Sequence, residues 1–355
     1  MSNSLREYVA STGKIPLSWV SRTPNQPYLN LGDALSPVIV SLLSGLPTSH
    51  VAAKSGKTRL AAVGTIGHMF SGGEISFWGT GTSPHLNPSA EPTQKLPYRL
   101  PQDTIMSVYA TRGPFTRKLL APDASKPGVY GDPLWLLPRF HDAPTDKKYE
   151  LGVILHLSEL DDRNYHPVPK AEHHRYLLSD ADKSHIKLIN TVTAPTIAAL
   201  RERLDEILSC KRIVSTSLHG MVFAESYGIP CLYFSPRASS AGIGQVDLDS
   251  GEGIDLRFND LYRGLGQTTL DVWYQPRRKE TSWDTLIETI DKSWYAKKLD
   301  EDALIEAFPL QLNPMQKGAT GSALGHPLIN ATPTSNKKDR SAPKSWLGKL
   351  VDRIR

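Results

Sequence analysis

His219 is the residue whose type and position best suit proton transfer in this chain of 355 residues. A predicted short buried strand ends at 216, just before it, and the run 221–227 with helical spacing begins just after it. A second apolar run at 231–234 completes a predicted parallel strand–helix–strand unit, in which ligands bind beyond the carboxyl ends of the strands. There an imidazole can exchange a proton near neutral pH. The alternative is that His219 only caps the helix.

Two arginines are candidates for binding an anion at the same edge. Arg112 follows the predicted strand 104–110, with Pro114 in the first turn of the next helix, and Arg237 lies in a loop of small residues after the strand 231–234. A guanidinium at a strand end can hold a carboxylate or phosphate through two hydrogen bonds. The alternative for Arg112 is an ordinary surface ion pair.

Glycine and small polar residues follow the other predicted strands. Gly79 and Gly81 come after a strand that ends near 78, where backbone amides can approach a ligand. Asn30 and Asp33 precede a predicted helix, and Asp132 follows a short strand. Asp33 can cap its helix or contact a hydroxylated ligand, and Asp132 can cap the next helix or face a cleft. Neither glycine run matches a dinucleotide fingerprint or a Walker loop.

The elements that must position these residues alternate as strand and helix in two successive sets. We therefore predict an α/β protein with two Rossmann-like domains facing a cleft. The N-terminal domain covers 1–145, a polar linker follows, and the C-terminal domain covers 149–310.

Composition narrows the possible functions. A hydrophobic content of 39% and a charged content of 22% are typical of a globular protein, and the net charge of +5 suits small anionic substrates. We expect no nucleic-acid partner, because the first part of the chain has no basic tract. Cys210 and Cys231 lie in apolar settings, which favours reduced core thiols in a cytoplasmic protein. The histidines at 166, 173 and 174 match no metal template, so we expect no metal.

The last part of the chain differs from the rest. Residues 311–342 have few large apolar side chains and predict a flexible tether. Residues 343–355 place apolar and basic side chains on opposite faces of a predicted helix, as in anchors that lie on a membrane surface. Such a helix could instead dock on its own domain or on a partner.

Several of these motifs together resemble the polysaccharide pyruvyl transferase family, especially its bacterial exopolysaccharide branch. The resemblance covers about residues 28–240, and the motifs occur in the family's order. They are Asn30-Leu31-Gly32-Asp33, Phe77-Trp78-Gly79-Thr80-Gly81, Tyr109-Ala110-Thr111-Arg112-Gly113-Pro114, Gly131-Asp132-Pro133 and Ser217-Leu218-His219-Gly220 through Gly228-Ile229-Pro230.

The resemblance implies a fold like that of B-type glycosyltransferases. It also implies a reaction in which phosphoenolpyruvate, a co-substrate rather than a cofactor, gives its pyruvyl group to two hydroxyls of one sugar. The products are a cyclic ketal and phosphate. Several members have an arginine two residues before the histidine, where this chain has Ser217. We therefore expect Arg112 first and Arg237 second to hold the donor, with Arg117 less suited because it lies deeper in its helix.

A lipid-linked oligosaccharide acceptor would give the segment 343–355 a purpose, because that segment would hold a cytoplasmic enzyme at the inner face of the plasma membrane. His219 would then act as general acid, and Asp33 or Asp132 as base. The alternatives are a glycosyltransferase that uses a nucleotide sugar, since the fold is shared, and a non-catalytic scaffold for polysaccharide assembly.

Overall fold

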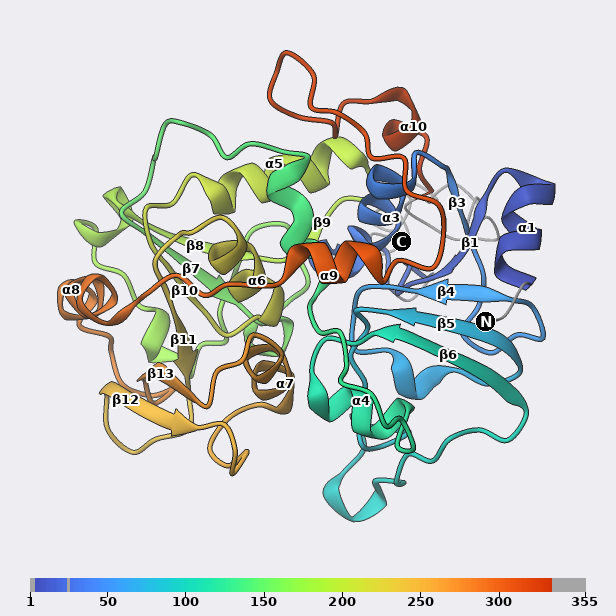
Figure 1. Ribbon diagram of the computed structural model, residues 1–355. Helices are drawn as coiled ribbons and strands as arrows, with labels where there is room; N and C mark the ends of the chain where they lie inside the picture. Colours follow the sequence, from blue (N-terminus) through green and yellow to red (C-terminus); the bar gives the residue numbers. More distant parts are fainter. Residues whose placement is uncertain (1–3, 24–25, 334–355) are drawn as a thin grey trace, which may run out of the picture.

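The computed structural model describes residues 4–23 and 26–333. Its N-terminal half is built on a five-stranded, wholly parallel sheet in the order β3-β1-β4-β5-β6 (Figure 1). The strands are β1 (Ile15–Ser18), β3 (Thr48–His50), β4 (Arg59–Ala61), β5 (Gly73–Trp78) and β6 (Thr104–Ala110). The helices of this half are α1 (Ser4–Thr12), α2 (Leu31–Ala34), α3 (Ser36–Ser44) and α4 (Pro114–Leu120), with 3₁₀ segments η1 (Gly67–Met69), η2 (Pro92–Gln94) and η3 (Pro133–Arg139).

The C-terminal half is built on a six-stranded sheet in the order β12-β13-β11-β10-β7-β8. Only β12 is antiparallel to its neighbour. The strands are β7 (Leu151–Leu155), β8 (Ile186–Asn190), β10 (Ile213–Ser215), β11 (Cys231–Ser235), β12 (Gly242–Asp247) and β13 (Thr269–Tyr274). The helices are α5 (Ile197–Leu208), α6 (Leu218–Ser226), α7 (Leu256–Gly264) and α8 (Trp283–Ser293), with 3₁₀ segments η4 (Leu157–Glu159), η5 (His174–Tyr176) and η6 (Asp182–Ser184).

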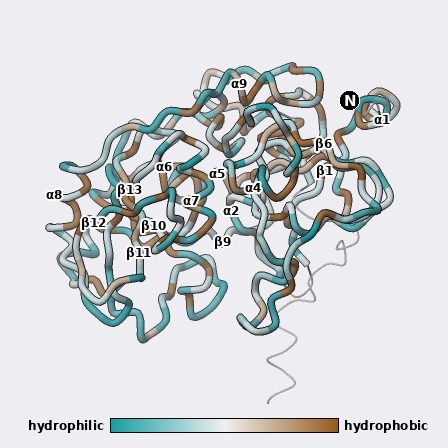
Figure 2. Tube along the Cα trace, turned by 60° about the horizontal axis from the view of Figure 1, so that its bottom comes forward, coloured by the Kyte–Doolittle hydropathy of each residue, from teal (hydrophilic) through white to brown (hydrophobic). Residues whose placement is uncertain are grey.

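This architecture confirms the predicted α/β class, and it is compatible with two Rossmann-like domains. The central strands read as continuous apolar runs because helices cover both faces of a parallel sheet. All residues of β7 and β10 are buried, and so is every residue of α3. Figure 2 shows hydrophobic segments concentrated along the inner strands and helices, whereas many outer loops are hydrophilic.

The two halves are joined away from the linker as well. Strand β2 (Leu29–Asn30) of the N-terminal half pairs antiparallel with β9 (Val192–Thr193) of the C-terminal half. Helix α2 begins directly after β2 and lies against α5. One cluster of buried apolar residues runs through both halves, including Leu17, Trp78 and Phe223. A segment predicted to belong to the first domain is therefore held in place by the second.

The chain returns to the N-terminal half after α8. Helix α9 (Glu301–Glu306) crosses between the halves in Figure 1, and the carbonyl of Leu304 accepts a hydrogen bond of 2.8 Å from Trp78 Nε1. The ring of Phe308 meets the Trp78 ring edge-on, with the centroids 4.8 Å apart. The predicted end of the C-terminal domain at residue 310 therefore falls within a segment that packs on the first half.

The predicted tether 311–342 is corrected over its described part, residues 311–333. Backbone amides of Asn313 and Met315 donate to carbonyls of α3, and the amide of Ala323 donates to the carbonyl of Phe140. Helix α10 (Pro327–Asn330) buries Ile329. The composition predicted too little order, because the segment gains these hydrogen bonds and buries a few side chains against the surface of the N-terminal half. The rest of the predicted tether and the predicted helix 343–355 lie outside the described residues.

Within residues 4–23 and 26–333, no helix is long and apolar enough to cross a membrane.

Candidate active site

His219 is buried at the start of α6, immediately after β10. The predicted strand, polar turn and helix around it are therefore confirmed. Gly32 of α2 packs directly on the imidazole: a Cβ atom at Gly32 would lie 1.9 Å from His219 Nδ1. Nε2 has no hydrogen-bond partner and lies 3.7 Å from Asp132 Oδ2. The imidazole is thus held by contact from the opposite half, with one nitrogen left available.

Asp132 both caps the following helical segment and faces His219, the two roles that its sequence position allowed. Its Oδ1 caps η3 by accepting a hydrogen bond of 3.0 Å from the amide of Leu134. Its Oδ2 faces His219 Nε2, and the residue is 1% exposed. A carboxylate fixed in this way can orient an imidazole or stabilise its protonated form.

Asn30 and Asp33 bring a second carboxyl group to the same place. Asn30 is the cap of α2, because its Oδ1 accepts a hydrogen bond of 3.3 Å from the amide of Gly32. The capping role suggested for Asp33 is therefore wrong, which leaves its carboxyl group for other contacts. Burial raises the pKa of Asp33; the charge of His219 opposes this shift, and that of Asp132 adds to it. A carboxyl group with a raised pKa suits proton transfer.

Arg112 lies at the carboxyl end of β6 and is 1% exposed, so its alternative as a surface residue is wrong. Its Nη1 donates to Thr65 Oγ1 at 2.8 Å, and its Nε lies 3.5 Å from Asp260 Oδ2. Neither Nε nor Nη2 makes a hydrogen bond. Burial lowers the pKa of Arg112, while the carboxylates of Asp260 and Asp132 oppose that shift. Arg112 and His219 thus both lie within electrostatic reach of Asp132.

Gly79 and Gly81 make this arrangement possible without offering their amides to a ligand. The amide of Gly79 donates to the carbonyl of Ala110, and that of Gly81 donates to the carbonyl of Gly64. A Cβ atom at Gly81 would lie 2.3 Å from the guanidinium carbon of Arg112. Gly79 has a φ of 84° and lies against Pro133. Their contribution is to leave space for neighbouring residues.

The two other predicted donor-binding residues are not equivalent. Ser217 is buried at the N-cap of α6, and its amide donates to Ser215 Oγ at 2.9 Å. Its side chain makes no capping hydrogen bond. Arg237 is exposed, and its Nη1 donates to the carbonyl of Ile254 at 3.0 Å. Arg237 therefore lies beside the start of α7 rather than against Asp132.

Arg257 in the first turn of α7 is a candidate that the sequence analysis missed. Its Nε and Nη2 donate to the two carboxylate oxygens of Asp255, each at 3.0 Å. Its Nη1 lies 3.2 Å from His156 Nε2. Arg257 is close enough to influence the pKa values of both Asp33 and Arg112. The sequence signal was an Asp-x-Arg pattern at a helix start, which reads as an ordinary cap.

His156 follows β7 and completes this side of the site. Burial lowers its pKa to about 4, and the charge of Arg257 acts in the same direction. The imidazole is therefore neutral at pH 7, and its Nε2 can accept the hydrogen bond from Arg257. The strand ends of both sheets thus contribute to one cluster of cations, carboxyl groups and imidazoles.

Comparison with known families agrees with the resemblance drawn from the motifs. Residues 100–237 match the family model described as polysaccharide pyruvyl transferase. The matched range contains Arg112, Asp132 and His219. Comparisons with curated proteins and with solved structures gave no significant match.

Proposed function

From the polysaccharide pyruvyl transferase family of residues 100–237, we propose that this protein transfers the pyruvyl group of phosphoenolpyruvate to two hydroxyls of one sugar. The product is a cyclic pyruvate ketal on an exopolysaccharide repeat unit, with phosphate released. One observation supports this reaction above all: His219 Nε2 and two nitrogens of Arg112 are buried without hydrogen-bond partners beside Asp132. Buried polar atoms are normally paired, so unpaired ones indicate a place for a ligand.

The donor is a compact anion, and the cluster offers two arginines to bind it. Nη2 of Arg112 can donate to a carboxylate or phosphate, whereas Nε lies 3.5 Å from the carboxylate of Asp260. Arg257 adds a second positive charge near Asp33, on the side of the C-terminal sheet. In this proposal Arg257 supplies the charge that Ser217 lacks, and Arg237 has only a long-range effect.

Proton transfer begins at the enol of the donor. His219 Nε2 gives a proton to the methylene carbon, which becomes a methyl group, and a sugar hydroxyl attacks the adjacent carbon. The carbon–oxygen bond to phosphate breaks, phosphate leaves, and the second hydroxyl attacks the same carbon to close the ketal. Each hydroxyl loses one proton in the reaction. Asp33, whose pKa is raised by burial, accepts the proton of the first hydroxyl and passes it to the departing phosphate. The imidazole of His219, neutral after its own proton transfer, takes the proton of the second hydroxyl, while Asp132 keeps the imidazole oriented.

Phosphate release from phosphoenolpyruvate, measured with a panel of lipid-linked sugars, tests this proposal. His219→Ala should lower the rate by about 10²–10⁴-fold, the usual contribution of a general acid. The exposed His174 provides a matched control, and His174→Ala should leave the rate unchanged. Near-normal turnover by His219→Ala would remove that residue from the mechanism.

The same assay separates the two rival functions. A glycosyltransferase would release a nucleoside diphosphate from a nucleotide sugar and would not consume phosphoenolpyruvate. A scaffold would release no phosphate with any acceptor. Formation of both phosphate and an acid-labile ketal on the acceptor would exclude each of them.

We further propose that the acceptor is lipid-linked and that residues 343–355 hold the enzyme at the inner face of the plasma membrane. Deletion of 343–355 should then reduce binding to anionic lipid vesicles without slowing turnover of a water-soluble acceptor. Unchanged vesicle binding would exclude this role for the segment.

A further inference from the structure

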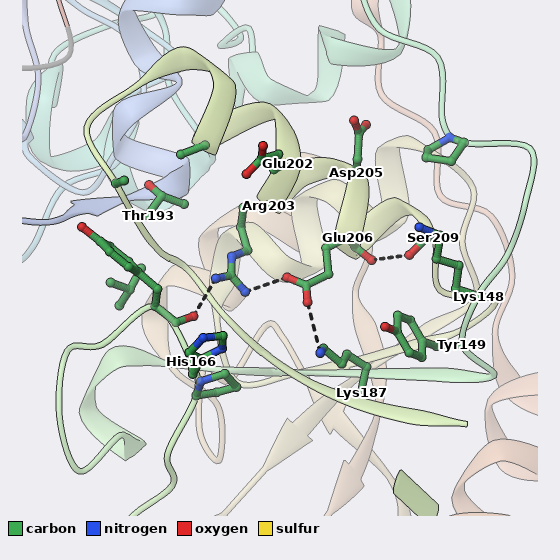
Figure 3. Close-up of a pocket in the computed structure, with 16 residues that line it drawn as sticks. Lys148, Tyr149, His166, Lys187, Thr193, Glu202, Arg203, Asp205, Glu206 and Ser209 are labelled. Carbon is green, nitrogen blue, oxygen red and sulfur yellow. Dashed lines mark hydrogen bonds and ion pairs between the residues drawn. The ribbon is translucent and has the colours of Figure 1, made fainter. Parts of the chain in front are cut away.

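A groove lies beside the polar face of α5, at the β8 edge of the C-terminal sheet (Figure 3). Its volume is about 640 Å³, and three parts of the chain form its walls. They are the segment around Lys148 and Tyr149, the loop that carries Tyr165 and His166, and α5 with the neighbouring residues of β8 and β9. This groove has no part in the proton transfer proposed above.

A row of charged side chains crosses the groove and is fixed by the protein itself. Arg203 Nη1 lies 2.7 Å from Glu206 Oε2, and Lys187 Nζ lies 3.6 Å from Glu206 Oε1. Arg203 Nη2 also donates to the carbonyl of Tyr165 at 2.7 Å. Figure 3 shows these groups joined in a line from the loop to β8. The polar groups of the groove are thus already oriented before any ligand arrives, which lowers the cost of binding.

The composition of the lining indicates a neutral, polar ligand. Three cationic side chains are balanced by three carboxylates, Glu202, Asp205 and Glu206, so the groove does not select a polyanion. Small and apolar side chains, among them Ala194, Ala199 and Val192, line the rest of the groove. Tyrosine rings at 149 and 165 add flat surfaces with polar edges. Flat aromatic surfaces among oriented hydrogen-bonding groups suit a sugar, whose ring has apolar C–H faces and a rim of hydroxyls.

The groove is connected to the candidate active site through one strand pair. Val192 and Thr193 line the groove and pair with Asn30 and Leu29, respectively. Asn30 caps the helix that carries Asp33 and the glycine packed on His219. The β2–β9 pair therefore joins one wall of the groove to the helix that carries Asp33.

We propose that this groove binds the sugar units of the acceptor beyond the unit that is modified. The inference rests on the proposed function for the identity of the saccharide, but its binding step can be measured without catalysis. The groove would make the enzyme prefer an oligosaccharide over a single sugar. This role for the groove would also explain its two tyrosines and balanced charges, which lie away from His219 and Arg112.

The test is binding of neutral oligosaccharides of three to six glucose, galactose or mannose units, without phosphoenolpyruvate, by ligand-observed NMR. Tyr165 is 45% exposed, so Tyr165→Ala should fold normally and bind a responsive oligosaccharide about tenfold more weakly. The matched control is Tyr295→Ala, at a tyrosine that is 53% exposed and does not line the groove. His219→Ala should still bind the oligosaccharide. The affinity for free galactose should be the same in Tyr165→Ala as in the wild type.

Two results would overturn the proposal: no oligosaccharide binds the full chain, or Tyr165→Ala and Tyr295→Ala bind equally well. Thermal unfolding of each variant confirms that a loss of affinity is not a loss of fold. The phosphate-release assay distinguishes this failure from failure of the proposed function. If phosphate is released but Tyr165→Ala has an unchanged KM for long acceptors, only the groove is excluded. If oligosaccharide binding depends on Tyr165 but no phosphate is released, the groove is confirmed as a saccharide site and the proposed pyruvyl transfer is excluded.

Discussion

Two buried arginines in the N-terminal sheet illustrate opposite uses of the same side chain. Arg59 lies at the start of β4, and the four hydrogens on its two terminal nitrogens are shared among six backbone carbonyls at 2.7–3.4 Å. Its guanidinium also lies 5.4 Å from the centre of the Phe70 ring. Arg112 lies at the other end of the sheet, where Nη1 donates to one hydroxyl, Nε lies 3.5 Å from a carboxylate oxygen of Asp260, and Nη2 has no hydrogen-bond partner. Both residues are almost completely buried.

The difference shows how a structural cation is distinguished from one that can bind a ligand. Around Arg59, loops from two strands turn their carbonyls inward, so the arginine joins them at the amino-terminal edge of the sheet. Around Arg112, the absence of a side chain at Gly81 leaves room for the guanidinium, which is influenced by the charges of Asp260 and Asp132. Ligands in parallel α/β sheets bind at this carboxyl-terminal edge.

The largest expected effect is on stability at Arg59. Arg59→Met would remove the guanidinium from six carbonyls, only some of which have a second donor, and we expect the free energy of unfolding to fall by about 4 kcal/mol. Urea unfolding measures this loss. Activity per folded molecule should stay at the wild-type level, and a stability within about 1 kcal/mol of wild type would contradict the structural role.

A single methyl group added at Gly32 tests whether the position of the His219 imidazole matters for activity. Because the new Cβ atom would lie 1.9 Å from Nδ1, Gly32→Ala must displace the imidazole from Asp132. We expect phosphate release to fall by about 10²-fold or more, approaching the effect of removing the general acid. Gly228→Ala is not a suitable control, since its φ is 65°, but Gly56 has open space around it and no positive φ. Gly56→Ala should leave activity unchanged; equal activity in both variants would show that the imidazole need not be held there.

Arg112→Lys keeps the charge but removes the planar fork, so it should affect binding more than folding. We expect kcat/KM for phosphoenolpyruvate to fall by about 10²-fold, chiefly through KM. Asp260 keeps its hydrogen bonds from the amide and hydroxyl of Thr116, so the free energy of unfolding should change by only about 1 kcal/mol. Steady-state kinetics with varied donor, together with urea unfolding, separate these effects. A large stability loss with unchanged KM would place Arg112 with Arg59 as a structural residue.

The smallest effect concerns His156, a half-buried imidazole whose neighbour is the cation Arg257. Its pKa is about 4 in the folded protein and 6.5 ordinarily, so the unfolded chain takes up the proton first as pH falls. The stabilisation from the neutral imidazole is complete above pH 6.5 and is lost as pH falls toward 4. Between pH 7 and pH 4.5, the free energy of unfolding of His156→Asn should therefore fall by about 2 kcal/mol less than that of the wild type. Unfolding curves at pH 7 and pH 4.5 measure the difference, and equal pH dependence in both proteins would contradict it.

Much of the candidate site could be predicted because its residues follow apolar strands in the chain. A buried parallel strand followed by a polar turn places His219 and Arg112 at strand ends whatever the details of packing. The short strand predicted before Asp132 is only an isolated bridge between Tyr130 and Thr111. Arg257 could not be found in this way, since it lies in a helix after a long loop and its relevance depends on His156 and Asp33 across space. The packing of 311–333 was missed for a similar reason, because its partners are carbonyls of α3, far away in the sequence.

The sequence by itself determined the α/β class, the strand–turn–helix around His219 and the family to which residues 100–237 match, because these depend on local apolar patterns and short motifs. Only the tertiary structure decided which glycines make room for His219 and Arg112, which side-chain nitrogens lack hydrogen bonds, and which segments form the walls of the groove beside α5. Those properties arise where segments distant in the chain meet, so no local pattern of residues records them.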